Sequence, residues 1–170
     1  MNLSLLAIAL ASLLAVFLLF KRKATAPNNT GEERSDWTMF DWVDEAGPKI
    51  LQSRDFKPSD ARGRFSVAII IEWKYGTTGF PNQTVMESIY EVEAALGTIR
   101  NDRSAIHVHT LTGNGLREWC YYAANYPAFE VRFNQLVASF PKLPIEISFQ
   151  ADPKWDYWQN VKSIAAGQSA

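Results

Sequence analysis

Hydrophobic and polar residues alternate over several stretches of this chain, and a period of two predicts β-strands. The alternation is clearest from Phe65 to Tyr75, where every second residue is apolar or aromatic. Asn114-Gly115, the pair favoured in a tight type I′ turn, separates two further stretches of this kind. The strands predicted in this way are 65–75, 105–112, 116–123 and 145–150, with a hairpin of 37–43 and 49–54 around a turn at 44–47.

Apolar residues recur at steps of three and four in two other stretches, which predicts helices. The first helix begins with the capping box Thr84-Val85-Met86-Glu87. The second begins near Pro127 and ends at Pro141. Asp152-Pro153 predicts the start of a short final helix, with Asp152 as its cap.

The predicted order is strand, helix, strand, strand, helix, strand. This is the βαββαβ, ferredoxin-like plan, in which two helices cover one face of an antiparallel sheet. The N-terminal hairpin and the short C-terminal helix are additions to that plan. We therefore predict one α+β domain over residues 36–170, long enough to bury a core of its own. The plan itself does not define a function.

An uncharged apolar run extends from Leu3 to Phe20, and its 18 residues span about 27 Å as a helix, close to the hydrocarbon thickness of a bilayer. Lys21, Arg22 and Lys23 follow directly. We predict a single-pass transmembrane anchor over residues 1–23 and a flexible linker over 24–35. The positive-inside rule then places the domain on the cytoplasmic side of the cell membrane. The alternative is secretion into a periplasm, since Ala24-Thr25-Ala26 resembles a cleavage site.

Composition excludes several classes of protein. The chain has 170 residues, a formal net charge of −1 and 47% hydrophobic residues, which excludes a disordered chain. Beyond the basic cluster at 21–23 the chain is acidic, so we expect no nucleic-acid partner. A single cysteine excludes an intramolecular disulfide and an all-thiolate zinc site.

The sharpest candidate for chemistry is a metal site on the middle hairpin. His107 and His109 are two residues apart on one predicted strand, so we expect them on one face. With a two-residue loop, His109 lies opposite Cys120 and His107 opposite Tyr122, on one face with Glu118. Two imidazoles and a thiolate are suitable zinc ligands.

A three-residue loop would shift this register by one and place Trp119 and Tyr121 there instead. The structural alternative is a histidine pair packed on aromatic residues near a sheet edge, with Cys120 as a small core residue. If the two histidines have only this structural role, we expect the protein to bind no cofactor.

Glu93 differs from the other acidic residues of the first helix because it flanks the apolar stripe beside Val92 and Leu96. We expect it to form a half-buried ion pair with Arg117. The competing interpretation is a metal-dependent hydrolase built around His107, His109 and Glu93.

Several short motifs carry a family resemblance. They are Trp37, Thr78-Gly79-Phe80-Pro81, Glu93, Thr112-Gly113-Asn114-Gly115-Leu116-Arg117-Glu118-Trp119, Tyr121-Tyr122 and Asp152-Pro153-Lys154-Trp155. In this order and spacing, over roughly residues 36–158, the chain resembles the uncharacterised bacterial family known as domain of unknown function 695. The resemblance implies no established activity.

The sequence therefore predicts a module anchored to the membrane through residues 3–20 that binds a protein partner or a ligand and is not an enzyme. Aromatic residues are enriched in protein-binding hot spots, and we expect Trp155 and Trp158 to be partly exposed. The predicted contact residues are Arg117, Tyr122, Trp155 and Trp158.

Overall fold

The computed structural model describes residues 37–55, 59–101 and 103–168. The predicted anchor at 1–23 and linker at 24–35 lie outside these residues. Within the described ranges, no helix is long and apolar enough to cross a membrane.

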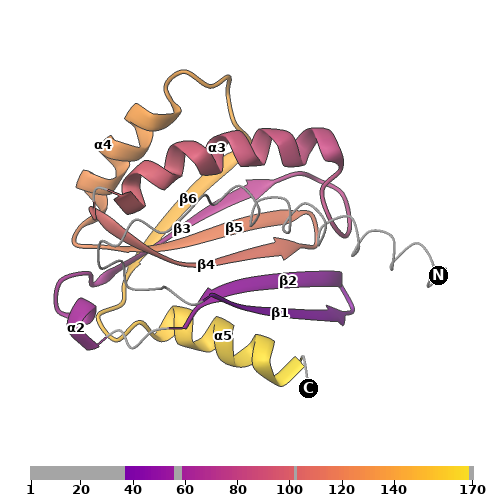
Figure 1. The fold of residues 1–170 in the computed structure, drawn as a ribbon, viewed down its shortest axis with the longest axis horizontal. Helices are drawn as coiled ribbons and strands as arrows, with labels where there is room; N and C mark the ends of the chain where they lie inside the picture. The colour runs from indigo at the N-terminus through magenta and orange to yellow at the C-terminus, as the bar shows by residue number, and fades with distance from the viewer. Residues whose placement is uncertain (1–36, 56–58, 102, 169–170) are drawn as a thin grey trace, which may run out of the picture. The chain divides into compact units, whose positions relative to one another are not determined.

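The domain is a mixed α+β structure built on a six-stranded antiparallel sheet with the order β1-β2-β4-β5-β3-β6 (Figure 1). Each predicted strand and helix is found, with small differences at the ends. The elements in chain order are β1 (Trp37–Asp44), β2 (Gly47–Arg54), α2 (Ser59–Arg62), β3 (Val67–Lys74), α3 (Gln83–Asn101), β4 (Ala105–Gly113), β5 (Leu116–Ala123), α4 (Tyr126–Val137), β6 (Ile145–Ala151) and α5 (Asp156–Gln168).

The predicted βαββαβ order runs from β3 to β6. β5 pairs with β4 on one side and β3 on the other, and β6 pairs with the far side of β3. The N-terminal hairpin of β1 and β2 extends the sheet beyond β4, because β2 pairs with β4 and β1 pairs with β2. β1 and β6 are therefore the two edges of the sheet.

Helices pack against both faces of the sheet. α3 and α4 cover one face and α5 lies against the other (Figure 1). The larger core lies under α3 and α4, where Ile89, Val92 and Leu96 meet β3 and β5. The smaller core lies under α5 and contains Phe65, Ala68, Val108, Cys120, Tyr122, Trp155 and Trp158.

The structure shifts two predicted helix starts. Asn82, not Thr84, caps α3, because its Oδ1 accepts the Val85 N–H at 3.0 Å. Asp152 accepts the Asp156 N–H at 2.8 Å, so it does cap α5. However, the chain turns at Trp155, whose φ is 63°, before the helix begins.

The β4–β5 hairpin has the predicted two-residue turn but a different register further along. Gly113 faces Leu116, and Asn114 and Gly115 have the positive φ angles of 53° and 75° that a type I′ turn requires. His109 lies opposite Cys120, as predicted, but His107 lies opposite Tyr121 instead of Tyr122.

A β-bulge between His107 and His109 causes the difference. The bulge inserts one extra residue, which resets the alternation of side chains along β4. His107 stacks on Tyr121 in the face that α3 and α4 cover, at 4.7 Å between ring centroids. His109 stacks on Tyr157 of α5, at 6.0 Å. The expectation that both histidines share one face is therefore wrong.

Candidate functional site

The motifs that carry the family resemblance lie mostly in two clusters of buried polar side chains. One cluster lies on each face of the sheet. In the first, Glu93 of α3 accepts three hydrogen bonds on one carboxylate oxygen. The donors are Arg117 Nε at 3.0 Å, Trp119 Nε1 at 2.6 Å, and Arg117 Nη2, which also forms the ion pair. Arg117 Nη1 donates to Thr112 Oγ1 at 2.5 Å. The structure thus brings Glu93 and Arg117 together, with the guanidinium buried against the sheet.

The loop containing Gly79 and Pro81 is attached to the same end of the sheet. The Tyr75 hydroxyl donates to the Gly79 carbonyl oxygen at 2.7 Å. Burial raises the pKa of Tyr75 to about 12, which keeps the phenol protonated and able to donate. The Gly115 N–H also points to the Gly79 oxygen, at 3.5 Å. This cluster therefore joins α3, the loop and the β4–β5 turn.

The second cluster lies under α5 and is centred on Asp152. Its carboxylate accepts the Tyr122 hydroxyl at 2.6 Å and the Tyr157 N–H at 2.9 Å, in addition to the Asp156 N–H. Burial by itself would raise the pKa of the Asp152 carboxyl, but the hydrogen bonds from Tyr122 and these backbone groups outweigh it and lower the pKa. Trp155 Nε1 donates to the Phe65 carbonyl oxygen at 2.7 Å. Asp152 and Trp155 thus fix the start of α5 to the sheet.

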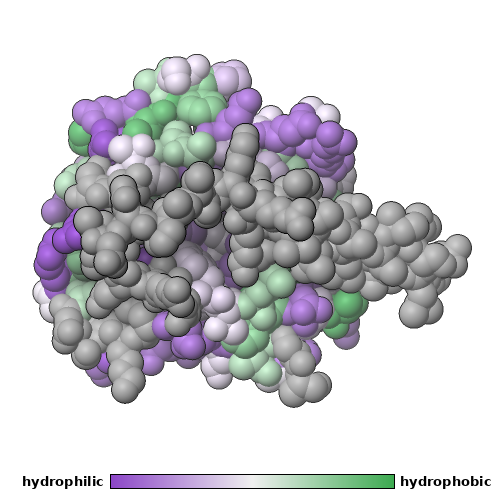
Figure 2. Space-filling model, in the orientation of Figure 1, coloured by the Kyte–Doolittle hydropathy of each residue, from purple (hydrophilic) through white to green (hydrophobic). Residues whose placement is uncertain are grey.

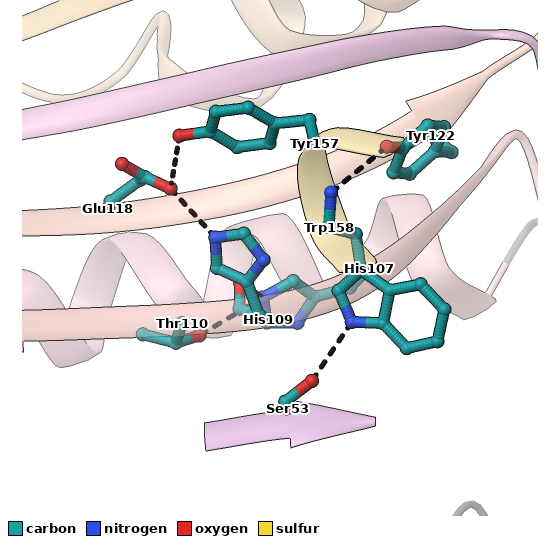
Figure 3. A network of polar contacts seen from close by, with 8 residues as sticks. All are labelled: Ser53, His107, His109, Thr110, Glu118, Tyr122, Tyr157 and Trp158. Atoms are coloured by element: carbon teal, nitrogen blue, oxygen red, sulfur yellow. Dashed lines mark hydrogen bonds and ion pairs between the residues drawn. The ribbon is translucent and has the colours of Figure 1, made fainter. Parts of the chain in front are cut away.

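Glu118 adds a second polar contact between α5 and the sheet (Figure 3). Its Oε1 lies 2.7 Å from His109 Nε2 and accepts the Tyr157 hydroxyl at 3.0 Å. His109 is completely buried, and its Nδ1 has no hydrogen-bond partner within the described part of the chain. Further along α5, Trp158 Nε1 donates to Ser53 Oγ at 2.9 Å (Figure 3). These contacts secure α5 to β2, β4 and β5.

The three candidate zinc ligands do not converge. His107 and His109 face opposite sides of the sheet, and His107 Nε2 lies 2.9 Å from the His109 carbonyl oxygen and 3.0 Å from Thr110 Oγ1. Burial raises the pKa of the Cys120 thiol well above its ordinary value, so the thiol stays protonated. Among the residues that the structure describes, no group of three His, Cys, Asp or Glu side chains is placed to hold a metal ion.

The four predicted contact residues are all buried. Trp155 and Trp158 are 0% and 3% exposed, so the expectation that they are partly exposed is wrong. Their indoles pack edge to face between α5 and the sheet, and each N–H finds an acceptor there. Tyr122 and Arg117 are buried in the second and first clusters. None of the four is available to a partner at the surface.

The exposed apolar side chains that line up instead belong to β1, a predicted strand of which only Trp37 was noted in the sequence, as a family motif, and not as a contact residue. Trp37, Met39 and Val43 are 36%, 45% and 56% exposed and lie on one face of this edge strand. We call them the β1 face. Figure 2 shows a strongly hydrophobic spot over the turn end of the β1–β2 hairpin, in contrast to the hydrophilic surface of α3. The signal was present in the sequence: residues 37–43 carry large apolar side chains at both odd and even positions.

The fold and the two clusters define an α+β domain whose antiparallel sheet is covered on both faces. The chain matches the model of a family of unknown function (DUF695) over residues 51–161, more than half of its length, and it belongs to that family. The match begins in β2 and ends in α5, so Trp37 and the rest of β1 lie outside it. The comparisons with curated proteins and with solved structures found no match.

Proposed function

We propose that this chain is a non-catalytic protein-binding module that takes up a partner strand along β1. The observation that carries the proposal is the exposed β1 face, Trp37, Met39 and Val43, on an edge strand of the sheet. Strand addition to an exposed sheet edge is a recurring mode of protein recognition, in which backbone hydrogen bonds provide affinity and alternate side chains provide specificity.

The side chains that could do acid–base chemistry already form ion pairs and hydrogen bonds within the domain. This supports a binding role over catalysis. Glu93 and Arg117 neutralise each other, and Asp152 accepts hydrogen bonds from Tyr122 and the start of α5. His109 and Glu118 are buried against Tyr157. A catalytic group must reach a substrate in a concave site, whereas these side chains hold helices on the sheet.

The backbone of β1 is suited to strand addition. Pro48 lies opposite Val43 in β2, and a proline has no N–H to donate to its neighbour. Val43 and Pro48 are therefore a pair without mutual hydrogen bonds, and such pairs alternate with hydrogen-bonded ones along an antiparallel ladder. It follows that the N–H and C=O groups of residues 37, 39 and 43 point to the outer edge, where no described strand pairs with them.

We further propose that residues 3–20 tether the module to the cell membrane, with the domain in the cytoplasm. The uncharged run and the basic residues that follow it support this orientation. A reporter fused after Ala170 tests it: a cytoplasmic reporter should be active and an exported one inactive. Activity of the exported reporter alone would contradict this topology.

The binding role is tested by a photo-crosslinking residue, p-benzoylphenylalanine, placed at Met39 in the full-length chain in cell membranes. The matched control carries the same residue at Ser163, which is exposed on α5. We expect a discrete crosslinked protein species from position 39 that is at least fivefold weaker from position 163. Equal crosslinking from both positions would contradict a docking role for β1.

A further inference from the structure

We infer that one end of the domain docks on an anionic lipid surface, the cytoplasmic face of the membrane that holds the tether. The inference goes beyond the partner strand at β1, and it rests on the proposed tether, which would bring lipid to this end. The registers of the sheet place the first residues of β1, β3 and β4 and the last residues of β2, β5 and β6 together. We call this end, with α2 and the start of α5, the basic end (Figure 1).

Basic side chains gather at the basic end, although the formal net charge of the whole chain is −1. They come from the end of β2, from α2 and α5, and from the connections before β3, β4 and α5. The basic side chains described there are Arg54, Arg62, Arg64, Arg103, Lys154 and Lys162.

The acidic side chains described at the same end do not cancel this charge. Asp152 is buried under α5, and Asp55 pairs with Lys162 at 2.9 Å. Asp156 is exposed, but so are Arg64 and Lys154. Positive charge therefore predominates among the side chains that the structure describes on this surface.

Arg62 adds an independent observation that points to an anion. Its side chain is half-buried, and its Nε is buried without a hydrogen-bond partner in the described part of the chain. A buried donor without an acceptor is costly, and phosphate and carboxylate oxygens are the acceptors that a guanidinium binds best. Lipid headgroups carry both kinds of oxygen. Arg64, exposed two residues further on, offers a second guanidinium to the same surface.

Several acidic side chains lie at the opposite end of the domain, too far away to oppose docking. A strand of eight residues is about 25 Å long, whereas salt screens charges beyond about 8 Å at physiological ionic strength. Lys49 and Lys74 at that end already form ion pairs with acidic neighbours. The acidic side chains there include Asp44, Glu45, Glu72, Glu87 and Glu146.

The chain enters the domain at the basic end, because its first described residue, Trp37, begins β1 there. A random-coil linker over residues 24–35 would have ends roughly 20 Å apart, so the tether would keep this end close to the bilayer. The cytoplasmic leaflet has a negative surface potential that attracts Lys and Arg close to it. Tether and charge therefore favour the same orientation.

This orientation is compatible with the proposed partner strand. β1 begins at the basic end and finishes at the opposite end, where Val43 and Asp44 precede the turn. Docking at the basic end would leave the far part of the β1 face away from the lipid. A partner strand could therefore bind while the domain is docked.

Quenching by a nitroxide on the lipid headgroup tests the lipid contact. A fluorescent label is attached to Gly63→Cys, an exposed position between α2 and β3 where nothing lies within 4 Å of an added Cβ. Gly167→Cys, near the far end of α5, has equally open surroundings and is the matched control. Native Cys120 is completely buried, so it does not take up the label. The full-length chain is reconstituted in vesicles of phosphatidylcholine alone or of phosphatidylcholine and phosphatidylserine at two to one.

We expect the label at position 63 to be quenched at least threefold more in the anionic vesicles than in the neutral ones. The label at position 167 should be quenched equally in both. Raising the salt from about 0.1 M to about 1 M should remove the difference at position 63, because the Debye length falls from about 10 Å to about 3 Å. Equal quenching at position 63 in both kinds of vesicle would overturn the inference.

Charge reversal locates the contact on the domain. Arg64→Glu should lower the quenching at position 63 in anionic vesicles at least twofold. Lys142→Glu makes the same change in charge at an exposed position before β6, at the opposite end, and should leave the quenching unchanged. Equal effects of the two substitutions would show that net charge acts without a specific docking surface, which also overturns the inference.

The outcomes separate this inference from the proposed function. If quenching ignores lipid charge but position 39 gives a specific crosslinked protein, the lipid contact is overturned and the binding module stands. If quenching follows lipid charge but position 39 gives no specific product, the lipid contact stands and the partner strand is contradicted. A chain that floats with neither kind of vesicle contradicts the tether and the lipid contact together.

Discussion

Glu93 is the acceptor at the centre of the first cluster, beside the apolar stripe of α3. One of its carboxylate oxygens accepts hydrogen bonds from Arg117 and from the Trp119 indole. Removing the carboxylate leaves a buried guanidinium whose remaining hydrogen bond, within the described part of the chain, is the one to Thr112. Breaking such a pair costs more than the pair contributes, because the remaining charge stays buried.

We expect Glu93→Ala to lower the free energy of unfolding by about 1.5–3 kcal/mol, the range for hydrogen bonds to charged groups. Glu91→Ala, an exposed position on the same helix, should change it by less than about 0.5 kcal/mol. Urea unfolding of the full-length chain in detergent measures both. Equal effects of the two substitutions would contradict a structural role for Glu93.

Asp152 gives the domain a dependence on acid pH. Its folded-state pKa lies below the ordinary value of 3.8, so its stabilisation is complete above that value and is lost as the pH falls through the folded-state pKa. We expect Asp152→Asn to cost about 1–2 kcal/mol at pH 7, through a weakened cap and a weakened bond to Tyr122.

The difference in unfolding free energy between wild type and Asp152→Asn should shrink as the pH falls from about 5 to about 2.5. Denaturant unfolding at a series of pH values measures this difference. A difference that stays constant, or grows, on acidification would show that the charge of Asp152 is not what stabilises the start of α5.

At the scale of elements, the β2–β4 contact depends on the absence of a side chain at Gly113. Gly113 has a φ of 146°, and a Cβ there would lie 2.9 Å from the Lys49 Cα and still closer to the Pro48 carbonyl oxygen. Because backbone atoms cannot move aside as a flexible side chain can, substitution would separate the N-terminal hairpin from the rest of the sheet.

We therefore expect Gly113→Ala to destabilise the domain by about 2–4 kcal/mol, from backbone strain and overpacking. Gly97→Ala is the matched control, since nothing lies within 4 Å of a Cβ at that helical position. It should be neutral or stabilising by up to about 1 kcal/mol. Thermal unfolding of both variants tests the comparison, and comparable melting temperatures would contradict it.

Most elements could be predicted because their signals are local. Alternation identified the strands, and Asn114-Gly115 identified both the turn and the pairing of Gly113 with Leu116. The bulge between His107 and His109 could not be predicted, because a single extra residue leaves no mark in the sequence. The bulge places the two histidines on opposite faces of the sheet. The metal hypothesis assumed an unbroken alternation of side chains along β4, so it was wrong on this point.

The burial of Trp155 and Trp158 is a different case. The spacing of these two tryptophans in the sequence is the same whether α5 covers the sheet or faces a partner. A usable signal lay in β5, where the side chains from Arg117 to Ala123 are buried on both faces. A strand with a nearly continuous run of large aromatic and apolar residues is typical of a sheet covered on both sides. That pattern indicates that the final helix fills the second face.

At the scale of the whole molecule, the two sheet edges differ. On β6 the exposed Phe149 stacks on Tyr126 of α4, with ring centroids 3.9 Å apart. On β1 the exposed residues extend along one face of the outermost strand, on the same side of the sheet as α3 and α4, where the Trp37 ring lies 5.1 Å from the His107 ring. We therefore predict that a partner strand binds to β1 and not to β6.

Amide hydrogen exchange of the full-length chain tests this claim most directly. The chain in its own cell membranes is compared with the purified chain in lipid vesicles, and β6 serves as the internal control. We predict that peptides covering Trp37–Asp44 exchange at least tenfold more slowly in the cell membranes, while those covering Ile145–Ala151 are unchanged. Exchange of β1 at the same rate in both samples would contradict the binding of a partner strand at this edge.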